Sequence, residues 1–373
     1  MSHLLKRVVF KSYLFINGVK HFAALPFRKK LFSSESYYPE YSNKKNKICI
    51  YFEQCLNILK YGAPNDFYFL YGFDIKGFKN RKGYVDNLEF RNRRESLNRK
   101  DDGTIIVLRD KFLFGLVAEG LGVNTPHNIA LVDGSKLFLH VKDSGEDSVN
   151  IKDLALVFPT LDGFAKLIDG ECANGVFHME IKDSSILVDG EPMTMEQLSR
   201  RFNDHRHIIQ QRITQHDAIN AIYPNAINTI RLVTVYDERT NQIEVLSCVL
   251  RVGCGKNHVD NWAVGGLSIG IDTETCTLRK YGFYKPGFGT KTAVHPNSNV
   301  VFEGYPIPFL KEAIEDAKRF HFFIKNVHSI GWDIAVTPSG PCFIEGNDNW
   351  EISLMQVCNH GYQKEFNNLF LQK

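Results

Sequence analysis

Two acidic residues near the C-terminal end of the chain have a spacing that a β-hairpin would bring together. Residues 332–347, WDIAVTPSGPCFIEGN, contain one turn signal, the Pro-Ser-Gly of residues 338–340, between two runs of β-prone residues. This pattern predicts an antiparallel hairpin with a short loop. If the loop has three residues, Asp333 lies directly opposite Glu345.

Opposed carboxylates favour a bound cation. The Cβ atoms of directly opposite side chains lie about 4.5–5.5 Å apart. Two carboxylates at such a short distance repel each other unless a cation or a shared proton lies between them. Asn347 shares a face with Glu345 because alternate residues of a strand do so. Mg²⁺ prefers such oxygen ligands and completes its shell with water and phosphates. We expect Asp333, Glu345 and Asn347 to be magnesium ligands; the alternative is a solvated hairpin end.

The chain also offers positive charge for the phosphates of a nucleotide. Lys166 stands in an apolar run that predicts a strand, and the loop that follows contains Gly170 and Gly175. Backbone N–H groups of such a loop can bind phosphate oxygens, and a lysine that points inward from a strand needs an anion. A surface lysine beside a loop is the simpler explanation of this segment alone.

Helix and strand patterns alternate along the chain. Helices are expected at residues 48–62, at 109–122 with Asp110 as the cap, and at 193–202. Short strands are expected at residues 129–141, 154–161, 164–181, 186–193 and 207–213, and strands alternate with Gly-rich loops from residue 228 onward. This order predicts an α+β protein, a mixed α/β fold in which two lobes enclose a cleft.

Composition excludes several classes of protein. With 43% hydrophobic and 23% charged residues among 373, the chain is neither disordered nor collagen-like. Its eight cysteines form no CxxC pair and no secretion signal is recognised, so we expect reduced thiols in a cytoplasmic protein. No GxGxxG follows a predicted strand, and no RNA-binding or zinc-finger pattern occurs. Neither a dinucleotide fold nor a nucleic-acid partner is expected.

The N-terminal part is strongly basic. Residues 1–100 hold 20 Lys and Arg against 8 Asp and Glu, and residues 1–34 contain no acid. Their apolar runs have at most four residues, whereas a membrane span needs about 20. The segment could be an interfacial helix that contacts the inner face of a membrane, a transit peptide, a packed helix or a solvated basic face.

Six segments, in this order, resemble the ATP-grasp superfamily: RDKFLFGLVAEGLGVNTP, FAKLIDGECANGV, IIQQRI, NAINTIRLVTV, GWDIA and FIEGN. The chain is most similar to the ATP-grasp proteins associated with sugar-transfer and surface-polysaccharide gene clusters, over about residues 60–360. This resemblance implies an ATP-grasp fold, two α+β lobes that grip ATP. We expect a partly helical basic region at 1–103, the lid lobe at 104–213, and the C-terminal lobe with the metal-binding hairpin at 214–373.

The resemblance also implies roles for individual residues. The residues that the resemblance implies for nucleotide binding are Lys111, Lys166, Gly170, Gly175, Gln211, Arg212 and Ile213. The two lysines hold phosphates, residues 211–213 meet the adenine edge, and Gln211 stands near the ribose. Arg231 and Arg251 neutralise charge on the transferring phosphoryl group, and Glu345 bridges two Mg²⁺ ions. The acceptor substrate is expected beside His258, Asp260, Asn261, Gly265 and Gly266.

The implied activity is that of an ATP-dependent carboxylate-amine ligase. A carboxylate takes the γ-phosphoryl group of ATP, and an amine then displaces phosphate to form an amide. The link to surface-polysaccharide gene clusters suggests that an amino acid is joined to a sugar acid or an amino sugar. The alternatives are a kinase of a sugar or small alcohol, and a non-catalytic nucleotide-binding scaffold in glycan assembly. Asp333→Asn and Glu345→Gln are both expected to abolish activity and to leave the fold intact.

Overall fold

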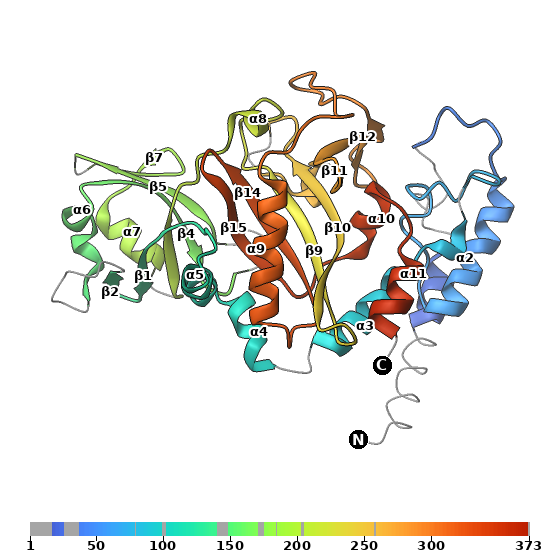
Figure 1. Cartoon of the computed structure of the whole chain (residues 1–373). Coiled ribbons are helices and arrows are strands. Elements are labelled where there is room, and N and C mark those ends of the chain that lie inside the picture. The colour runs from blue at the N-terminus through green and yellow to red at the C-terminus, as the bar shows by residue number, and fades with distance from the viewer. Residues whose placement is uncertain are drawn as a thin grey trace.

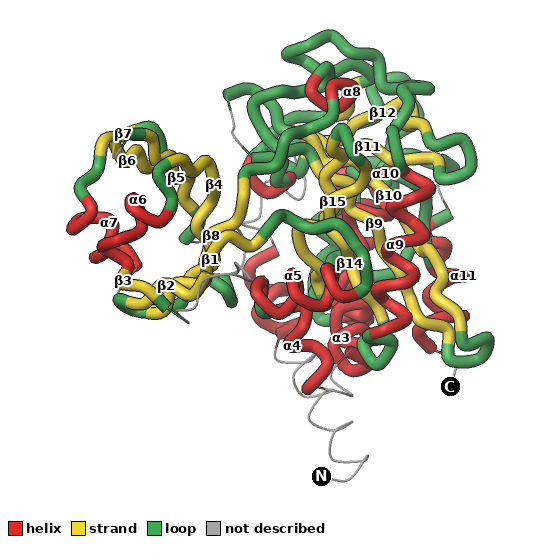
Figure 2. The backbone as a smooth tube through the Cα atoms, turned by 60° about the vertical axis from the view of Figure 1, so that its left-hand side comes forward, coloured by secondary structure: helices red, strands yellow, loops and turns green. Residues whose placement is uncertain are grey.

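Two antiparallel β-sheets organise the computed structural model (Figure 1). The structure describes residues 17–25, 37–78, 80–98, 102–139, 148–170, 175–183, 185–202, 205–256 and 259–371. One sheet is formed by residues 128–211 and the other by residues 229–347. Figure 2 shows the smaller lobe, with the first sheet, standing beside the larger one. The prediction of an α+β protein with two lobes is confirmed.

The first sheet has eight strands in the order β3-β2-β1-β8-β4-β5-β6-β7. Their bounds are β1 Asn128–Asp133, β2 Lys136–Leu139, β3 Val149–Asn150, β4 Thr160–Leu167, β5 Phe177–Lys182, β6 Ser185–Val188, β7 Glu191–Pro192 and β8 His207–Gln211. Helices α6 (Leu154–Val157) and α7 (Met195–Phe202) and the 3₁₀ turn η4 (Ile151–Asp153) belong to this lobe. Buried Leu154, Met179, Leu198 and Phe202 join them to the sheet in one apolar core.

The second sheet has seven strands in the order β13-β12-β11-β10-β9-β14-β15. Their bounds are β9 Thr229–Asp237, β10 Gln242–Val252, β11 Leu267–Asp272, β12 Thr277–Tyr284, β13 Lys291–Thr292, β14 Ser329–Thr337 and β15 Gly340–Asn347. The connections contain the short helix α8 (Asp217–Asn220) and the 3₁₀ turn η5 (Trp262–Val264). Its central strands β9 and β14 are almost fully buried, because helices cover both faces of the sheet.

Each face of the second sheet has its own apolar core. On one face, α4 (Asp102–Arg109), α5 (Lys111–Gly120) and α9 (Leu310–Phe323) pack around Trp332. On the other, α3 (Asn87–Asn98), α10 (Ile352–Cys358), α11 (Gln363–Phe366) and the π-helical turn η6 (Asn367–Leu371) pack around Trp350. Alternate residues of β14 therefore point into different surroundings, which separates Trp332 from its neighbour Asp333.

The N-terminal segment packs against the C-terminal helices. Helix α2 (Lys47–Tyr61), the turns of residues 63–78, the 3₁₀ turn η3 (Arg81–Gly83) and α3 follow one another, and Figure 1 shows them beside α10 and α11. Asn46 caps α2, and Gly62 ends it in the left-handed region at φ 81°, which glycine adopts without strain. Both the expected helix and its glycine end are confirmed.

One expected strand is wrong. Residues 154–157 of the predicted strand 154–161 form α6, and the strand begins only at Thr160. The Asn150 side chain accepts a hydrogen bond from the Lys152 N–H and starts the turn η4, which leads into the helix. Pro159 then separates helix from strand, since the residue before a proline avoids the helical region. Local capping and the burial of Leu154 outweigh the β-prone composition.

Two further findings bear on the expectations about the chain's environment. The seven cysteines that the structure describes are free thiols, and Cys248, Cys342 and Cys358 are buried. Within the described ranges, no helix combines the length and the apolar character that crossing a bilayer requires.

Candidate functional site

Strand pairing places three charged residues in one row across the second sheet. In the register, Arg231 of β9 pairs with Asp333 of β14, and Asp333 pairs with Glu345 of β15. Residues directly opposite on neighbouring strands project from the same face. The predicted opposition of Asp333 and Glu345 is confirmed.

The route to this pairing differs from the expected one. The turn has two residues, since Thr337 pairs with Gly340, and a β-bulge at Ile344 then shifts the register. The Thr337 hydroxyl closes the short turn by accepting the Ser339 N–H and donating to the Gly340 carbonyl at 2.8 Å. The predicted three-residue loop is therefore wrong, but the extra bulge residue restores the pairing of the two acids.

Asp333 is held by two arginines. The Arg231 guanidinium donates to both Asp333 oxygens at 2.5 and 2.9 Å, and Arg251 Nη2 lies 3.2 Å from Oδ2. Burial alone would raise the pKa of Asp333, but the two guanidinium groups outweigh burial and lower it to about 2. Asp333 therefore carries a full negative charge at neutral pH.

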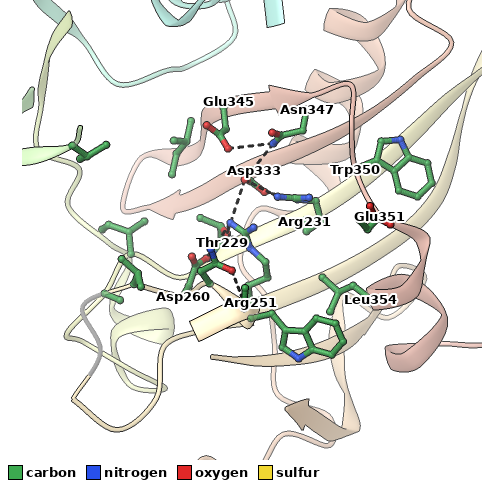
Figure 3. Close-up of a pocket in the computed structure, with 18 of the residues that line it drawn as sticks. Thr229, Arg231, Arg251, Asp260, Asp333, Glu345, Asn347, Trp350, Glu351 and Leu354 are labelled. Carbon is green, nitrogen blue, oxygen red and sulfur yellow. Dashed lines mark hydrogen bonds and ion pairs between the residues drawn. The ribbon is translucent and has the colours of Figure 1, made fainter. Parts of the chain in front are cut away.

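Glu345 has no comparable partner. Its Oε1 accepts from Asn347 Nδ2 at 3.2 Å, and the same amide nitrogen lies 3.5 Å from Asp333 Oδ2 (Figure 3). Among the described residues, no salt bridge to Glu345 is found. Burial, and then the neighbouring Asp333 carboxylate, raise the pKa of Glu345. The arrangement leaves Glu345 as a buried acid that a cation would stabilise.

A second ion pair lies deeper in the same site. Arg251 of β10 donates to the Thr229 hydroxyl at 2.7 Å and lies 3.4 Å from Asp260 Oδ2. Asp260 in turn accepts from the Thr229 hydroxyl at 2.5 Å and from its N–H at 3.0 Å. Burial raises the pKa of Asp260, although Arg251 opposes the shift. No sequence pattern indicated Thr229, whose hydroxyl links Asp260 to Arg251.

The two predicted phosphate lysines line the same cleft from different elements, Lys166 from the first sheet and Lys111 from helix α5, which packs on the second sheet. Lys166 of β4 donates to Gln210 Oε1 at 3.0 Å, and Lys111, the first residue of α5, donates to the Gly170 carbonyl at 2.5 Å. Burial lowers the pKa of Lys166 to about 8, and Glu345 opposes that shift. Glu345 therefore acts on Lys166 across the gap between the two sheets.

The remaining predicted nucleotide residues lie at the edge of the first lobe. Gln211 is the last residue of β8, and Arg212 and Ile213 begin the connection to the second sheet. All three line the cleft. Gly170 also lines the cleft, whereas Gly175, at φ 68°, packs against Leu167 and is not among the lining residues.

The predicted acceptor residues divide into three groups. Asp260 and Asn261 line the cleft, and Asn261 also caps η5 by accepting the Ala263 N–H at 2.8 Å. Gly265 and Gly266 do not line the cleft; they shape the loop behind it, and a Cβ at Gly266 would lie 2.6 Å from the Asp260 carbonyl oxygen. His258 lies outside the described residues.

The acids, the arginines and the two lysines line one cleft with a volume of about 1930 Å³. It extends from the lid strands to residues 63–67 and 86–91 of the N-terminal segment. There the Phe67 ring stacks on Trp262 at 6.0 Å, and Arg91 lies 2.8 Å from Glu351. Figure 3 shows Glu351 and Trp350 beyond Arg231 as seen from Glu345. The sequence did not indicate that the N-terminal segment forms a wall of this cleft.

A further group of polar side chains stands on the lid strands. His178 Nε2 lies 2.6 Å from Asp162 Oδ1 and 3.7 Å from Glu180 Oε1, and Arg212 lies 3.4 Å from Asp162. Among the described residues, these three offer ligand atoms close enough to hold one metal ion. Asp162 is exposed and already paired with His178 and Arg212, so the group is explained by ion pairs alone.

The raised pKa of Glu345 predicts how pH changes stability. Above its raised pKa the ionised Glu345 destabilises the fold, and below its usual value of about 4.5 it is protonated in both states. Relative to Glu345→Gln, the wild-type free energy of unfolding should therefore fall as pH rises above about 4.5, then reach a plateau. Urea unfolding of both proteins without Mg²⁺ measures this difference. A difference that stays constant from acidic to neutral pH would contradict it.

Comparison with known families agrees with this architecture. Residues 92–368 match the model of the family described as sugar-transfer associated ATP-grasp. The match covers well over half of the 373 residues. The two lobes are those of the ATP-grasp fold, and the chain belongs to the sugar-transfer associated ATP-grasp family.

Solved structures that resemble this chain have low sequence identity to it. A D-Ala:D-Ser ligase from Enterococcus faecalis (VanG) has 11% identity and a TM-score of 0.41, over 72% of this chain and 62% of the ligase. D-alanyl-alanine synthetase A from Vibrio cholerae has 10% identity and a TM-score of 0.40, over 72% and 65%. An N5-carboxyaminoimidazole synthase from Aspergillus clavatus, in complex with ADP and 5-aminoimidazole ribonucleotide, has 10% identity and a TM-score of 0.37, over 71% and 51%. Each match spans less than two thirds of the solved chain. No curated protein sequence matches this chain significantly.

Proposed function

We propose that this protein is an ATP-dependent carboxylate-amine ligase that forms an amide through an acyl phosphate. The observation that carries the proposal is the row of Arg231, Asp333 and Glu345, which faces Lys166 across one cleft. A cation-binding acid, two arginines and a half-buried lysine are the groups that phosphoryl transfer from a nucleotide requires.

The nucleotide would lie between the two sheets. Lys111 and Lys166 would bind its phosphates together with the loop that contains Gly170 and Gly175, and residues 211–213 would meet the adenine, with Gln211 near the ribose. The lowered pKa of Lys166 supports this placement, because an adjacent phosphate would raise that pKa again and compensate for burial.

Glu345, Asn347 and Asp333 would hold Mg²⁺, with Glu345 between two ions. Glu345 fits this role because it is buried beside another carboxylate, with a raised pKa. Asn347 fits after a half-turn of its amide group, which would present Oδ1 instead of Nδ2 to the ion. Bound Mg²⁺ would offset the negative charge of the β- and γ-phosphate oxygens.

The reaction is a double displacement without a side-chain nucleophile. A substrate carboxylate oxygen bonds to the γ-phosphorus, the bond from that phosphorus to the β–γ bridging oxygen breaks, and ADP leaves. The amine nitrogen then bonds to the carbonyl carbon of the acyl phosphate, phosphate leaves with the electron pair of the C–O bond, and the nitrogen loses a proton. Arg231 and Arg251 would stabilise the charge that develops on the transferred group.

The two organic substrates would occupy the end of the cleft away from the lid. His258, Asp260 and Asn261 would contact the acceptor there, beside the loop that Gly265 and Gly266 shape. The family description names an association with sugar transfer, and we propose on this basis that a sugar acid or an amino sugar is joined to an amino acid in surface polysaccharide synthesis in the cytoplasm. A peripheral contact with a membrane stays a prediction of the basic N-terminal sequence.

Product analysis tests this function. The purified chain is incubated with Mg²⁺, ATP and panels of sugar acids, amino sugars and amino acids, and ADP, phosphate and organic products are followed by mass spectrometry. A ligase releases ADP and phosphate together only when a carboxylate and an amine are both present, and an amide accumulates.

Two other outcomes would replace the proposal. A stable phosphorylated sugar or alcohol formed without any amine would identify a kinase. Tight ATP binding without turnover in every substrate mixture, together with normal polysaccharide synthesis in cells that carry Glu345→Gln, would identify a nucleotide-binding scaffold.

A further inference from the structure

Helix α2 exposes a row of large apolar side chains, and two of its four buried residues, Gln54 and Asn57, are polar amides beside the apolar Ile50 and Ile58. Gln54 is 0% exposed and Asn57 is 4% exposed, whereas Phe52 is 63%, Leu56 61% and Leu59 72% exposed. Surface helices normally turn their apolar stripe toward the core. Together with Ile48 and Tyr51, the three exposed residues follow the three- and four-residue spacing of one helix face. We call this face the α2 stripe.

Hydrogen bonds fix the rotation of the helix, so that the stripe cannot turn inward. Gln54 Nε2 donates to the Asn65 carbonyl at 3.1 Å, and Gln54 Oε1 accepts the Asn65 N–H at 2.8 Å. Asn57 Nδ2 donates to the Ala63 carbonyl and to Asp86, and its Oδ1 accepts from Arg81 at 2.9 Å. Rolling the helix would leave these buried polar groups without partners. The stripe therefore stays exposed and is available to an external partner.

The charges around the stripe are positive. Lys47 and Lys60 stand exposed at the two ends of α2, and Lys20 of the preceding helical segment is also exposed. The only acid of α2 is Glu53, which pairs with Lys45 at 2.8 Å and with Arg81 at 3.4 Å. Residues 1–34 have seven Lys and Arg and no acid, and Glu35 and Glu40 follow before α2 begins. Of the exposed lysines, Lys60 interacts with Glu89 and Asp86. A contiguous apolar face flanked by exposed lysines matches an anionic, partly apolar surface.

We propose that the α2 stripe docks the protein on an anionic membrane surface, with Phe52, Leu56 and Leu59 in the interfacial layer and the lysines at the lipid headgroups. A second copy of the chain fits less well, because a two-fold contact through α2 would bring two basic surfaces together. Figure 1 shows α2 at the edge of the molecule farthest from the eight-stranded sheet. Docking there leaves the lid lobe unobstructed.

The test uses the full chain and vesicles, and it is independent of the proposed reaction. Sedimentation is measured with phosphatidylcholine vesicles and with vesicles of an equimolar mixture of phosphatidylglycerol and phosphatidylcholine. The variant Phe52→Gln/Leu56→Gln/Leu59→Gln removes the stripe and keeps residues that favour a helix. The matched control, Leu156→Gln/Val301→Gln/Phe323→Gln, changes residues of similar exposure, 80%, 57% and 62%, that lie on other elements.

We expect the wild type and the control to bind the mixed vesicles, and the stripe variant to bind at least about tenfold more weakly. Binding should fall at high salt and on pure phosphatidylcholine, because the lysines interact with anionic headgroups. Urea unfolding of the stripe variant at the wild-type midpoint would show that the loss is not a loss of fold.

Three results would overturn the proposal. The wild type could fail to bind mixed vesicles, or the stripe variant could bind them as well as the control does. A wild-type dimer that the stripe variant converts to a monomer, with no vesicle binding by either protein, would instead identify the stripe as an interface between copies of this chain.

Discussion

Replacing Glu345 by Gln should lower the rate of ATP-dependent product formation by about 10³-fold, comparable to the loss of one preorganised charged group in an active site. It should leave the folded protein at least as stable as the wild type at neutral pH. The variant keeps the shape of the side chain and its bond to Asn347, but it removes the acid that would balance a cation. Burial and Asp333 both oppose the ionisation of Glu345. A neutral amide at this position carries no charge, so it avoids the unfavourable interaction with Asp333.

The control for Glu345→Gln is Glu303→Gln, at an exposed residue that lies 3.8 Å from Lys280 and away from the cleft. Its turnover should equal that of the wild type. If Glu345→Gln retains Mg²⁺-dependent turnover at the control rate, Glu345 is not a ligand of the catalytic metal. If it unfolds instead, the repulsion that we assign to the two carboxylates is not present.

Replacing Asp333 by Asn should lower the free energy of unfolding by about 3 kcal/mol, the effect of breaking a buried ion pair from one side. The sequence alone favoured an intact fold, because the substitution removes one of two repelling acids. The structure corrects this expectation. The Arg231 and Arg251 side chains are 14% and 15% exposed and share Asp333 as their counter-charge. An amide would leave Arg231 without its ion-pair partner and Arg251 with Asp260 alone.

The free energies of unfolding of Asp333→Asn and of a control variant, Asp316→Asn, are measured by chemical denaturation and compared with that of the wild type. Asp316 pairs with one half-exposed arginine, Arg319, at 2.8 Å on the surface of α9, so its substitution should cost less than about 1 kcal/mol. Equal stability of the two variants would show that Asp333 does not hold the arginines. The opposite expectations for Asp333 and Glu345 also separate two acids that the sequence treats alike.

The sequence was sufficient for the local parts of the site. Asp333, Glu345 and Asn347 could be placed together by counting from one turn and because alternate residues share a face. The count succeeded only because the bulge at Ile344 compensates for a turn that is one residue shorter than expected. The cap at Asp110 and the glycine end of α2 are likewise properties of a few adjacent residues, and both are observed. These features depend on short-range geometry, which a single sequence states directly.

Contacts between residues far apart in the chain could not be predicted from the sequence. Nothing in the sequence around Phe67 indicates that its ring stacks on Trp262, about two hundred residues away, because sequence patterns give no pairing between distant loops. Asp260 was expected in the cleft, but its bonds to Thr229 depend on how the loop after β10 folds back over β9. The same limit explains α2, whose helical pattern was recognised while its rotation was not, since buried Gln54 and Asn57 take their partners from other segments.

The hairpin of β14 and β15 obeys a rule of parity. With a two-residue turn, Asp333 would face Ile344, and Glu345 would point to the opposite side of the sheet; the single bulge residue corrects the count. One extra residue in the turn and one bulge residue in the strand therefore have the same effect on which residue faces Asp333. In a chain of the same length, a three-residue turn without the bulge would present the same acids, whereas loss of the bulge alone would bring Ile344 opposite Asp333 and the longer turn alone would bring Gly346 there.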